Sequence, residues 1–208
     1  MVPSKPFAPA SERNSKPILS VLRYELRGAR SVLEIGSGTG QHAAYLAPAM
    51  SHLIWQPSDL PENLAGIRAW IADTAGTNIL EPIALDVRRD AQIPGLFDAV
   101  FSANTAHIMH FPTVERMFEL ADRVLGRGGI FCLYGPFKLR GEFSTQSNAD
   151  FHRSLRRQDP GMGIRNLEDV DSLAAKNRLE SRRLYAMPAN NLLRVWSRTL
   201  PGVENVTA

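Results

Sequence analysis

The sequence predicts an α/β protein with a doubly wound, mostly parallel seven-stranded sheet that ends in an antiparallel hairpin. Short apolar runs without polar alternation recur between residues 31 and 135, as expected of parallel strands that are covered on both faces. Amphipathic stretches separate these runs, which is the alternation of a parallel sheet with right-handed crossovers. Two more β-type runs close the chain. The short link between them, residues 188–191, favours an antiparallel pair at the sheet edge.

The strands and helices are expected to alternate along most of the chain. The predicted strands are residues 31–35, 53–56, 79–85, 99–103, 129–134, 179–187 and 192–198. The predicted helices are residues 16–27, 41–49, 61–72, 112–125 and 166–177. The helix at 112–125 is expected to end there because Gly126 and Gly128 follow it.

Two segments depart from this rhythm. Residues 1–13 are rich in Pro, Ser and charged side chains, and residues 136–166 hold several Gly, Arg and polar residues without a clear period. We expect 136–166 to be an insertion or lid, not a core element. The prediction is therefore one domain over residues 1–208, with an N-terminal segment, 1–15, and the insertion over the active site.

Composition places the chain among ordinary globular proteins, with 44% hydrophobic and 22% charged residues. The amino terminus has no apolar signal-peptide core and no apolar run is long enough to span a bilayer, so we expect a cytoplasmic protein without a membrane partner. A net charge of +3 gives a weak case for nucleic acid. The single cysteine, Cys132, excludes an internal disulfide and a cysteine-rich metal site, and its apolar surroundings indicate a buried thiol.

The stretch VLEIGSGTG follows the first predicted strand and carries the functional prediction. Its glycines, Gly36, Gly38 and Gly40, let the backbone turn sharply and approach a ligand, and Ser37 lies between the first two. The helix that follows would offer free N–H groups. In doubly wound sheets this turn lies at the switch point where ligands bind. We therefore expect a nucleotide-like cofactor here.

The spacing of the loop discriminates between cofactors. A dinucleotide fingerprint reads G-x-G-x-x-G, whereas this loop reads G-x-G-x-G, and the Gly-Lys-Ser/Thr ending of a P-loop is absent. Glu34 precedes the first glycine and would repel a pyrophosphate, but it suits an ammonium or sulfonium group. We therefore predict that the loop binds S-adenosylmethionine; the motif resembles motif I of the class I methyltransferases.

Further polar residues follow the second and fourth predicted strands. Asp59 is the candidate for the ribose hydroxyls, with Gln56 or Ser58 able to share this role; Asp59 could also cap the helix that begins at Pro61. After the fourth strand, Asn104 is a candidate pocket-lining residue.

Two histidines follow at His107 and His110. A histidine could remove a proton from an oxygen or nitrogen nucleophile, and His107 is the candidate base. A metal half-site is disfavoured because no further ligand follows at usable spacing, and a purely structural histidine stays an alternative.

Several specific strings of the sequence resemble one family. They are Pro9–Asn14, Trp55–Asp59, Asn104–Ile108, Tyr134–Lys138 and Ser147–Phe151. They resemble the DUF938 family of uncharacterised methyltransferases, which includes the methyltransferase-like protein 26 group. The resemblance extends from about Lys5 to Arg198 and implies a Rossmann-like, class I S-adenosylmethionine-binding fold without naming a substrate.

The resemblance also implies residue roles. Asp86, followed by Val87, takes the place of the acid that binds the adenine amino group, with a solvated loop acid as the alternative. Arg13 and Asn14 would lie at the mouth of the cofactor pocket. Residues 135–137 and the loop after them would lie on the acceptor side, so Tyr134 and Phe137 become candidate acceptor-side residues.

These observations together predict an S-adenosylmethionine-dependent methyltransferase that acts on an oxygen or nitrogen of a small molecule. A non-catalytic module that binds the cofactor or a partner is the alternative, and a nicotinamide-dependent oxidoreductase is disfavoured by the loop. Arg153, Arg156, Arg157 and Arg165 cluster in the insertion, with Arg182 and Arg183 further on. They are expected to form a solvated face or to contact an anionic acceptor, with nucleic acid as the other possibility.

Overall fold

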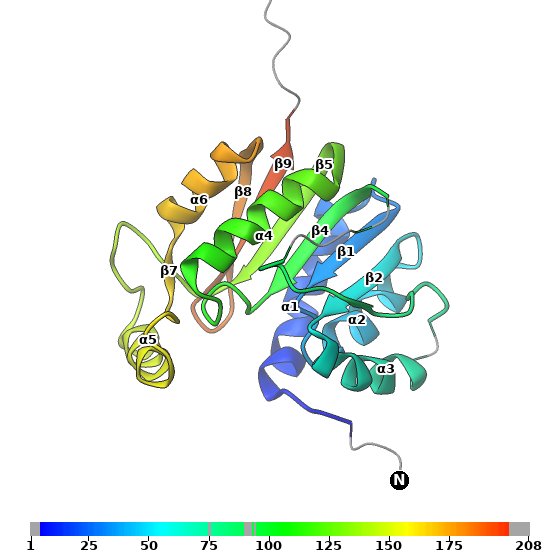
Figure 1. Ribbon diagram of the computed structural model, residues 1–208, viewed down its shortest axis with the longest axis horizontal. Helices are drawn as coiled ribbons and strands as arrows, with labels where there is room; N and C mark the ends of the chain where they lie inside the picture. Colours follow the sequence, from blue (N-terminus) through cyan, green and yellow to red (C-terminus); the bar gives the residue numbers. More distant parts are fainter. Residues whose placement is uncertain (1–4, 75, 90–92, 94, 200–208) are drawn as a thin grey trace, which may run out of the picture.

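The centre of the computed structural model is a seven-stranded sheet with the order β3-β2-β1-β4-β5-β9-β8 (Figure 1). The structure describes residues 5–74, 76–89, 93 and 95–199. Five strands are parallel: β1 (Ser31–Ile35), β2 (Ile54–Asp59), β3 (Ile83–Ala84), β4 (Phe97–Ala103) and β5 (Leu125–Gly135). The hairpin strands β8 (Leu179–Met187) and β9 (Asn191–Arg198) pair antiparallel, and β9 is antiparallel to β5. The predicted fold is confirmed.

The sheet has one topological switch point, between β1 and β4. The chain passes from β1 outward to β2 and β3, and then returns to β4 on the other side of β1. Leu33 in β1 lies opposite Val100 in β4 and Gln56 in β2, so the three central strands run in register. The loops after β1 and β4 therefore separate at the carboxyl end of the sheet, where ligands bind in open α/β sheets.

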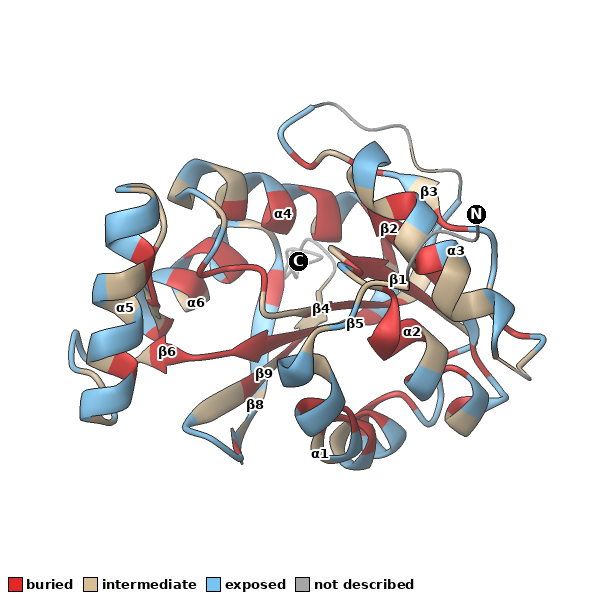
Figure 2. Cartoon of the chain, turned by 90° about the horizontal axis from the view of Figure 1, so that it is seen from below, coloured by how far each residue is buried: buried red, intermediate tan, exposed pale blue. Residues whose placement is uncertain are grey.

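Helices cover both faces of the sheet (Figure 2). On one face, α4 (Phe111–Val124) and α6 (Leu167–Lys176) pack over a core that includes Phe118, Phe131 and Trp196. On the other face, α1 (Pro9–Glu25) and α2 (Gln41–Leu46) cover a second core that includes Trp55 and Phe101. The helix α3 (Leu64–Ala72) packs beside α2, and short 3-10 turns occupy Pro48–Met50 and Pro61–Asn63.

The first helix begins earlier than expected. Residues 9–15, predicted as part of an irregular segment, form the first turns of α1, while residues 1–4 of that segment lie outside the described residues. Pro9 suits the first turn because that turn has no backbone donor to lose. Pro17 lies inside the helix, where the Ser20 hydroxyl donates to its carbonyl at 2.7 Å.

The third strand is shorter than the predicted 79–85. Only Ile83 and Ala84 form β3, and Ile79 contributes an isolated bridge to Trp55. Pro82 lies between them and cannot donate to the sheet. The amide of Gln56 donates instead to the carbonyl of Glu81 at 2.8 Å.

The insertion contains regular structure, in contrast to the irregular segment expected. Its residues include α5 (Gln146–Gln158) and a two-stranded sheet of β6 (Phe137–Lys138) and β7 (Arg165–Asn166). The helix α5 lies to one side of the main sheet (Figures 1 and 2). Thr145 caps α5 by accepting from the Asn148 amide at 3.3 Å. The helical spacing of apolar residues was too weak to predict α5, because this helix buries only Asn148 and Leu155.

No helix in the described part of the chain is both long enough and apolar enough to cross a membrane.

Candidate active site

A cavity of about 580 Å³ lies at the switch point of the sheet. The loops after β1, β2, β3 and β4 line it, together with two residues of the N-terminal segment and two of the insertion. Its wall includes Ala8, Ser11, Gly36, Ser37, Gly38, Thr39, His42, Asp59, Asp86, Val87, Asn104, Thr105, His110, Asp159 and Met162. This size falls within the range of small-molecule sites.

The three glycines of the loop have different structural roles. Gly36 has φ +73°, and a Cβ there would lie 2.6 Å from the Thr105 methyl carbon, so this glycine permits close packing of the loops after β1 and β4. Gly38 has φ +57°, lines the cavity, and has no atom within 4 Å of its Cβ position. Gly40, at φ +89°, packs against Ile67 of α3 instead of lining the cavity. Gly38 is thus the bare position that a ligand can approach.

Asp59 joins the end of β2 to the glycine loop. Its Oδ2 accepts from the Gly38 amide at 2.6 Å, and its Oδ1 accepts from the Leu60 amide and the Asn63 side chain, both at 2.7 Å. The predicted strand end was residue 56, but β2 continues to Asp59 and brings this carboxylate into the cavity wall. Oδ1 thus accepts two hydrogen bonds and Oδ2 accepts one, so Oδ2 keeps acceptor capacity for a ligand hydroxyl.

Glu34 is buried beneath the loop and does not line the cavity. Its carboxylate accepts from the Trp55 indole at 3.0 Å. Burial raises the pKa of Glu34 to about 7, against the lowering effect of hydrogen bonds from Trp55 and Ser37. The structure therefore places this acid in contact with the second strand, and not against the space for a ligand.

Asp86 and Val87 line the cavity directly after β3. Both carboxylate oxygens of Asp86 accept from the Arg88 guanidinium at 2.8 Å. These hydrogen bonds from Arg88 hold the pKa of Asp86 below its usual value. Asp86 is therefore an ionised acceptor that Arg88 fixes in place, and not a freely solvated loop acid.

The loop after β4 separates the two predicted histidines. His107 is buried, does not line the cavity, and packs its ring against Phe151 with a centroid distance of 5.3 Å. Burial, and then the charge of Arg165, lowers its pKa to about 4. His110 lines the cavity, and its Nε2 lies 2.8 Å from Oδ2 of Asp159, a residue of the insertion.

The remaining predicted residues divide between the cavity and the core. Asn104 lines the cavity with φ +60°, and its amide donates to the Tyr134 carbonyl at 2.9 Å. Tyr134 and Phe137 are buried in the two core clusters and do not line the cavity. Burial raises the pKa of the Tyr134 hydroxyl to about 12.

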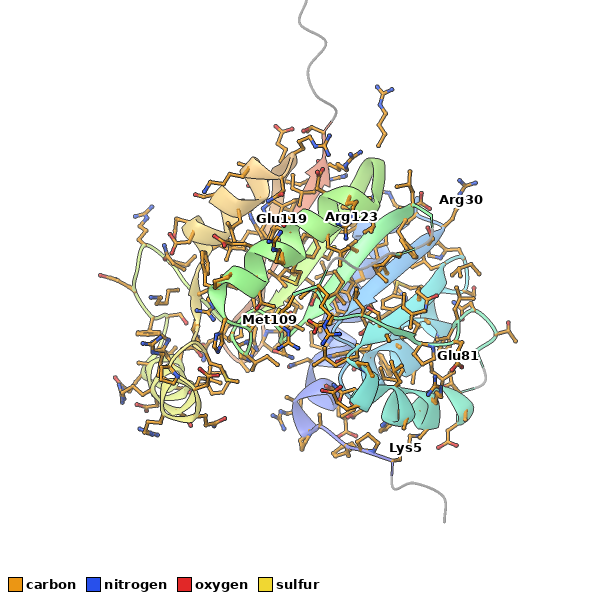
Figure 3. The ribbon with its side chains drawn as sticks, viewed as in Figure 1. Lys5, Arg30, Glu81, Met109, Glu119 and Arg123 are labelled. Carbon is orange, nitrogen blue, oxygen red and sulfur yellow. The ribbon has the colours of Figure 1, made fainter. Side chains whose placement is uncertain are left out.

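The N-terminal segment reaches the cavity through residues other than Arg13 and Asn14. Arg13 is exposed, Asn14 is buried, and neither lines the cavity, whereas Ala8 and Ser11 do. Lys5, labelled in Figure 3, lies in this segment. Its Nζ pairs with Asp73 at 2.6 Å, which ties the segment to the end of α3. The Ala8 amide donates to the Gln41 side chain at 2.6 Å and so fixes the segment against the start of α2.

His42 is a cavity residue that the sequence analysis missed. Its Nδ1 lies 3.3 Å from the Ser15 hydroxyl oxygen. The Ser15 hydroxyl proton is used by the Ser11 carbonyl at 2.7 Å, so Nδ1 must carry the proton of the ring. Burial lowers the pKa of His42 to about 4, which keeps the ring neutral.

The Nε2 atom of His42 is therefore an acceptor. It is buried and has no hydrogen-bond partner within the described ranges. Buried polar atoms are rarely left unpaired, and His42 belongs to the cavity wall, so this nitrogen is a candidate acceptor for a donor on a ligand. Its position at the start of α2, directly after the glycine loop, was the available sequence signal.

These features fit S-adenosylmethionine. The cavity offers a bare backbone at Gly38, carboxylates at Asp59 and Asp86, and an unpaired acceptor at His42 for a ligand with hydroxyl, amino and ammonium donors. A pyrophosphate would face two carboxylates. Within the described ranges, no group of three or more His, Cys, Asp or Glu residues is arranged to hold a metal ion.

Comparison with solved structures shows that this Rossmann-like fold is shared with several methyltransferases. An O-methyltransferase family 2 protein from Planctomyces limnophilus DSM 3776, solved with apigenin, superimposes with a TM-score of 0.80 at 18% identity, over 91% of this chain and 58% of that protein. Human N-acetylserotonin methyltransferase, solved with SAM, superimposes with a TM-score of 0.75 at 12% identity, over 89% of this chain and 52% of that protein. PigF, solved with SAH, superimposes with a TM-score of 0.74 at 17% identity, over 92% of this chain and 64% of that protein. The chain thus spans between about half and two-thirds of the length of these proteins.

The chain belongs to the family described as "Protein of unknown function (DUF938)", whose sequence profile matches residues 5–198.

Proposed function

We propose that this protein is an S-adenosylmethionine-dependent methyltransferase that methylates an oxygen or nitrogen atom of a small molecule. The observation that carries the proposal is the joined pair of Gly38 and Asp59, which presents a bare backbone and a carboxylate at the switch point. The similarity of fold supports the same class of reaction. When bound, the cofactor supplies a methyl group on a sulfonium for in-line transfer, which needs alignment and exclusion of water.

Different cavity residues would contact different parts of the cofactor. Asp59 would accept from the ribose hydroxyls, and Asp86, with Val87 beside it, would accept from the adenine amino group. Gly36, Ser37 and Gly38 would lie along the ligand. Glu34 supports this loop from below by holding Trp55, which differs from the direct contact with a cationic head expected from the sequence.

His42 would hold the ammonium group. A neutral imidazole with a free Nε2 accepts from an ammonium without adding a second charge. The Ser15 hydroxyl fixes the required tautomer, and Ser11, whose carbonyl orients that hydroxyl, lies in the cavity wall. This arrangement gives the N-terminal helix a direct part in cofactor recognition.

His110 is the candidate proton acceptor for the second substrate. It lies in the cavity wall, and Asp159 would stabilise the imidazolium that forms when the acceptor loses its proton. His107 is less suited because its lowered pKa makes it a weak base and it lies behind the wall. Near His110 the wall contains Ile108, Met109 and Met162, so an acceptor with an apolar body fits (Figure 3 shows Met109).

Two measurements test this function in a protein that we expect to be cytoplasmic. Calorimetric titration with S-adenosylhomocysteine should show one saturable site, and titration with NAD should show none. Incubation with S-adenosylmethionine and fractionated small-molecule extract should then yield a product heavier by one methylene unit in mass spectrometry. Binding without transfer to any fraction would favour the non-catalytic module, and failure to bind would refute the proposal.

A further inference from the structure

The insertion concentrates positive charge beside the acceptor end of the cavity. Lys138 belongs to β6, His152 and Arg156 to α5, and Arg165 to β7. Arg153, on the same helix, is paired with Asp150. By contrast, Lys138, Arg156 and Arg165 take part in none of the ion pairs found among the described residues.

Arg165 is the most enclosed of these cations. Its Nε donates to the Ala106 carbonyl at 3.0 Å, and its Nη2 donates to the carbonyls of Gly161, at 2.8 Å, and Met109. All three acceptors are neutral, so the charge has hydrogen bonds but no counterion. Its Nη1 has no hydrogen-bond partner in the part of the chain that the structure describes, which leaves two N–H groups of the guanidinium for a ligand.

Arg156 and His152 lie one helical turn apart and pack against the same glycine. A Cβ at Gly163 would lie 2.8 Å from a ring carbon of His152 and 3.4 Å from Cδ of Arg156. The Nδ1 of His152 accepts from the Ile164 amide at 3.1 Å, which leaves its Nε2 as a donor. Phe143 packs on the His152 ring with a centroid distance of 5.1 Å, and Nζ of Lys138 lies 5.7 Å from the Phe143 ring, so Lys138 lies on the same side of the insertion as His152 and Arg156. The charges of Lys138, Arg156 and Arg165 contribute, after burial, to a lowered pKa of His152.

Arg165 and Arg156 do not line the cavity, but they hold backbone carbonyls in its wall and beside it. Arg165 holds the carbonyl of Met109, which lies in the cavity wall next to His110. Arg156 donates to the Pro160 carbonyl, between the cavity residues Asp159 and Met162. Resting on the function proposed above, we propose that the methyl acceptor carries an anionic group, a carboxylate or a phosphate, that binds among Lys138, Arg156 and Arg165.

A small anion fits this group of cations better than a nucleic acid does. Nucleic-acid binding uses a stripe of exposed Lys and Arg along a backbone. Here the central cation is half-buried and held by loop carbonyls, and carboxylates of Asp150 and Asp159 interrupt the surrounding surface. Charge-assisted contact with one carboxylate or phosphate matches the Nη1 group of Arg165, whose N–H groups are not used by the loop carbonyls.

The test uses three probes: inorganic phosphate, 4-hydroxybenzoate, and methyl 4-hydroxybenzoate, which lacks the anionic group. Each is titrated calorimetrically into the full-length protein, with and without saturating S-adenosylhomocysteine. The test variants are Arg156→Gln and Lys138→Gln, and Arg157→Gln is the matched control because it removes an exposed charge from the same helix. Arg165→Gln is a poorer test because it also removes three hydrogen bonds that hold the loop.

We expect 4-hydroxybenzoate to bind, and the methyl ester to bind at least about tenfold more weakly than 4-hydroxybenzoate. Arg156→Gln should weaken anion binding about tenfold, with an unchanged melting temperature, and Arg157→Gln should leave it unchanged. The anion that binds more tightly identifies the group.

Other outcomes would overturn the proposal. They are equal binding of acid and ester, no binding of either anion, and an equal effect of Arg156→Gln and Arg157→Gln. Salt-dependent binding of an RNA oligonucleotide that both arginine variants weaken would indicate a nucleic-acid face instead. Titration with S-adenosylhomocysteine alone does not depend on the anion titrations. A failure of the proposed cofactor site can therefore be distinguished from a failure of the proposed anion site.

Discussion

The carboxylate of Asp59 accepts a hydrogen bond from the backbone amide of Gly38 at 2.6 Å, which joins the ends of β1 and β2 into one wall of the cavity. The two residues are 21 positions apart in the chain. The contact holds the bare stretch of backbone next to the acid that would bind the ribose. The proposed cofactor site is therefore built on the carboxyl ends of two neighbouring strands of the main sheet.

Replacing Asp59 should weaken cofactor binding. In Asp59→Ala the hydrogen bonds to the ribose and the brace on Gly38 are lost together, and each hydrogen bond to a charged group contributes about 1.5–3 kcal/mol. We expect the affinity for S-adenosylhomocysteine to fall by about 10- to 100-fold in calorimetry. Asp59→Asn, which keeps an acceptor for Gly38, should lose less. Equal affinities of the wild type and the alanine variant would remove Asp59 from the site.

Alanine substitutions at Gly36 and Gly38 should differ in their effects on the free energy of unfolding and on cofactor binding. Gly36→Ala places a methyl group 2.6 Å from Thr105 Cγ2 at positive φ, so overpacking adds to the cost from φ and the free energy of unfolding should fall by about 2–5 kcal/mol. Gly38→Ala meets no protein atom within 4 Å, so its stability cost should be only about 1–2 kcal/mol from φ.

The binding experiment on the same pair gives the sharper contrast. The Gly38→Ala methyl group enters the cavity, and the affinity for S-adenosylhomocysteine should fall at least about tenfold, since overpacking costs about 1–3 kcal/mol. Urea unfolding and calorimetry on both variants check this. If Gly38→Ala binds like the wild type, the ligand does not approach this stretch of backbone.

His42 should affect one end of the cofactor only. His42→Phe keeps a ring against Phe101, with which His42 makes an edge contact at 6.2 Å, and removes the acceptor Nε2. Affinity for S-adenosylhomocysteine should fall about tenfold, because a hydrogen bond to a charged donor is lost. Affinity for 5′-methylthioadenosine, which has no ammonium group, should stay the same. A parallel loss for both ligands would show that His42 acts only through packing.

Glu34 should make the stability depend on pH. The folded protein keeps the Glu34 proton to about pH 7, whereas the unfolded chain releases it near 4.5, the ordinary pKa of a glutamate. The folded state binds more protons between these values, so stability falls as the pH rises from about 4.5 to about 7 and stays lower above it. The full decrease in the free energy of unfolding is about 3 kcal/mol, because a difference of one in pKa corresponds to about 1.36 kcal/mol.

The variant Glu34→Gln removes this titration and keeps an acceptor for Trp55. Urea unfolding at pH 5 and pH 8 should show that stability of the variant relative to the wild type increases with pH. Because Glu34 does not line the cavity, affinity for S-adenosylhomocysteine should change less than about threefold. A large loss of affinity with unchanged stability would instead support direct contact between Glu34 and the ligand.

Much of the fold follows from the sequence because buried parallel strands have a strong local signature. The runs around Leu33, Val100 and Phe131 are apolar on both faces and pair as expected. The position of Asp59 in the cavity wall was predictable because strand, turn and helix follow one another around it, and its contact with the ribose stays a prediction. The third strand was overestimated because Pro82 removes a donor in the middle of an otherwise strand-like run.

The finer chemistry of the site depends on contacts between distant segments. The tautomer of His42 is set by Ser15, which lies on another helix 27 positions away. The loop after β4 turns at Thr105, whose carbonyl accepts from the amides of Ile108 and Met109 at 3.0 Å, and this turn decides which of the two nearby histidines faces the cavity. Sequence spacing alone cannot distinguish them, because both follow the same strand.

The shortness of β3 has a consequence for association in solution. Among the described strands it forms one margin of the main sheet, and with two residues it gives another chain few backbone groups to pair with. The opposite margin, β8, is longer but carries Glu180, Arg182 and Arg183, and its register shifts between Ser181 and Arg183. Charges and irregular edges disfavour the addition of foreign strands. The sheet is thus protected at both margins against growth into aggregates.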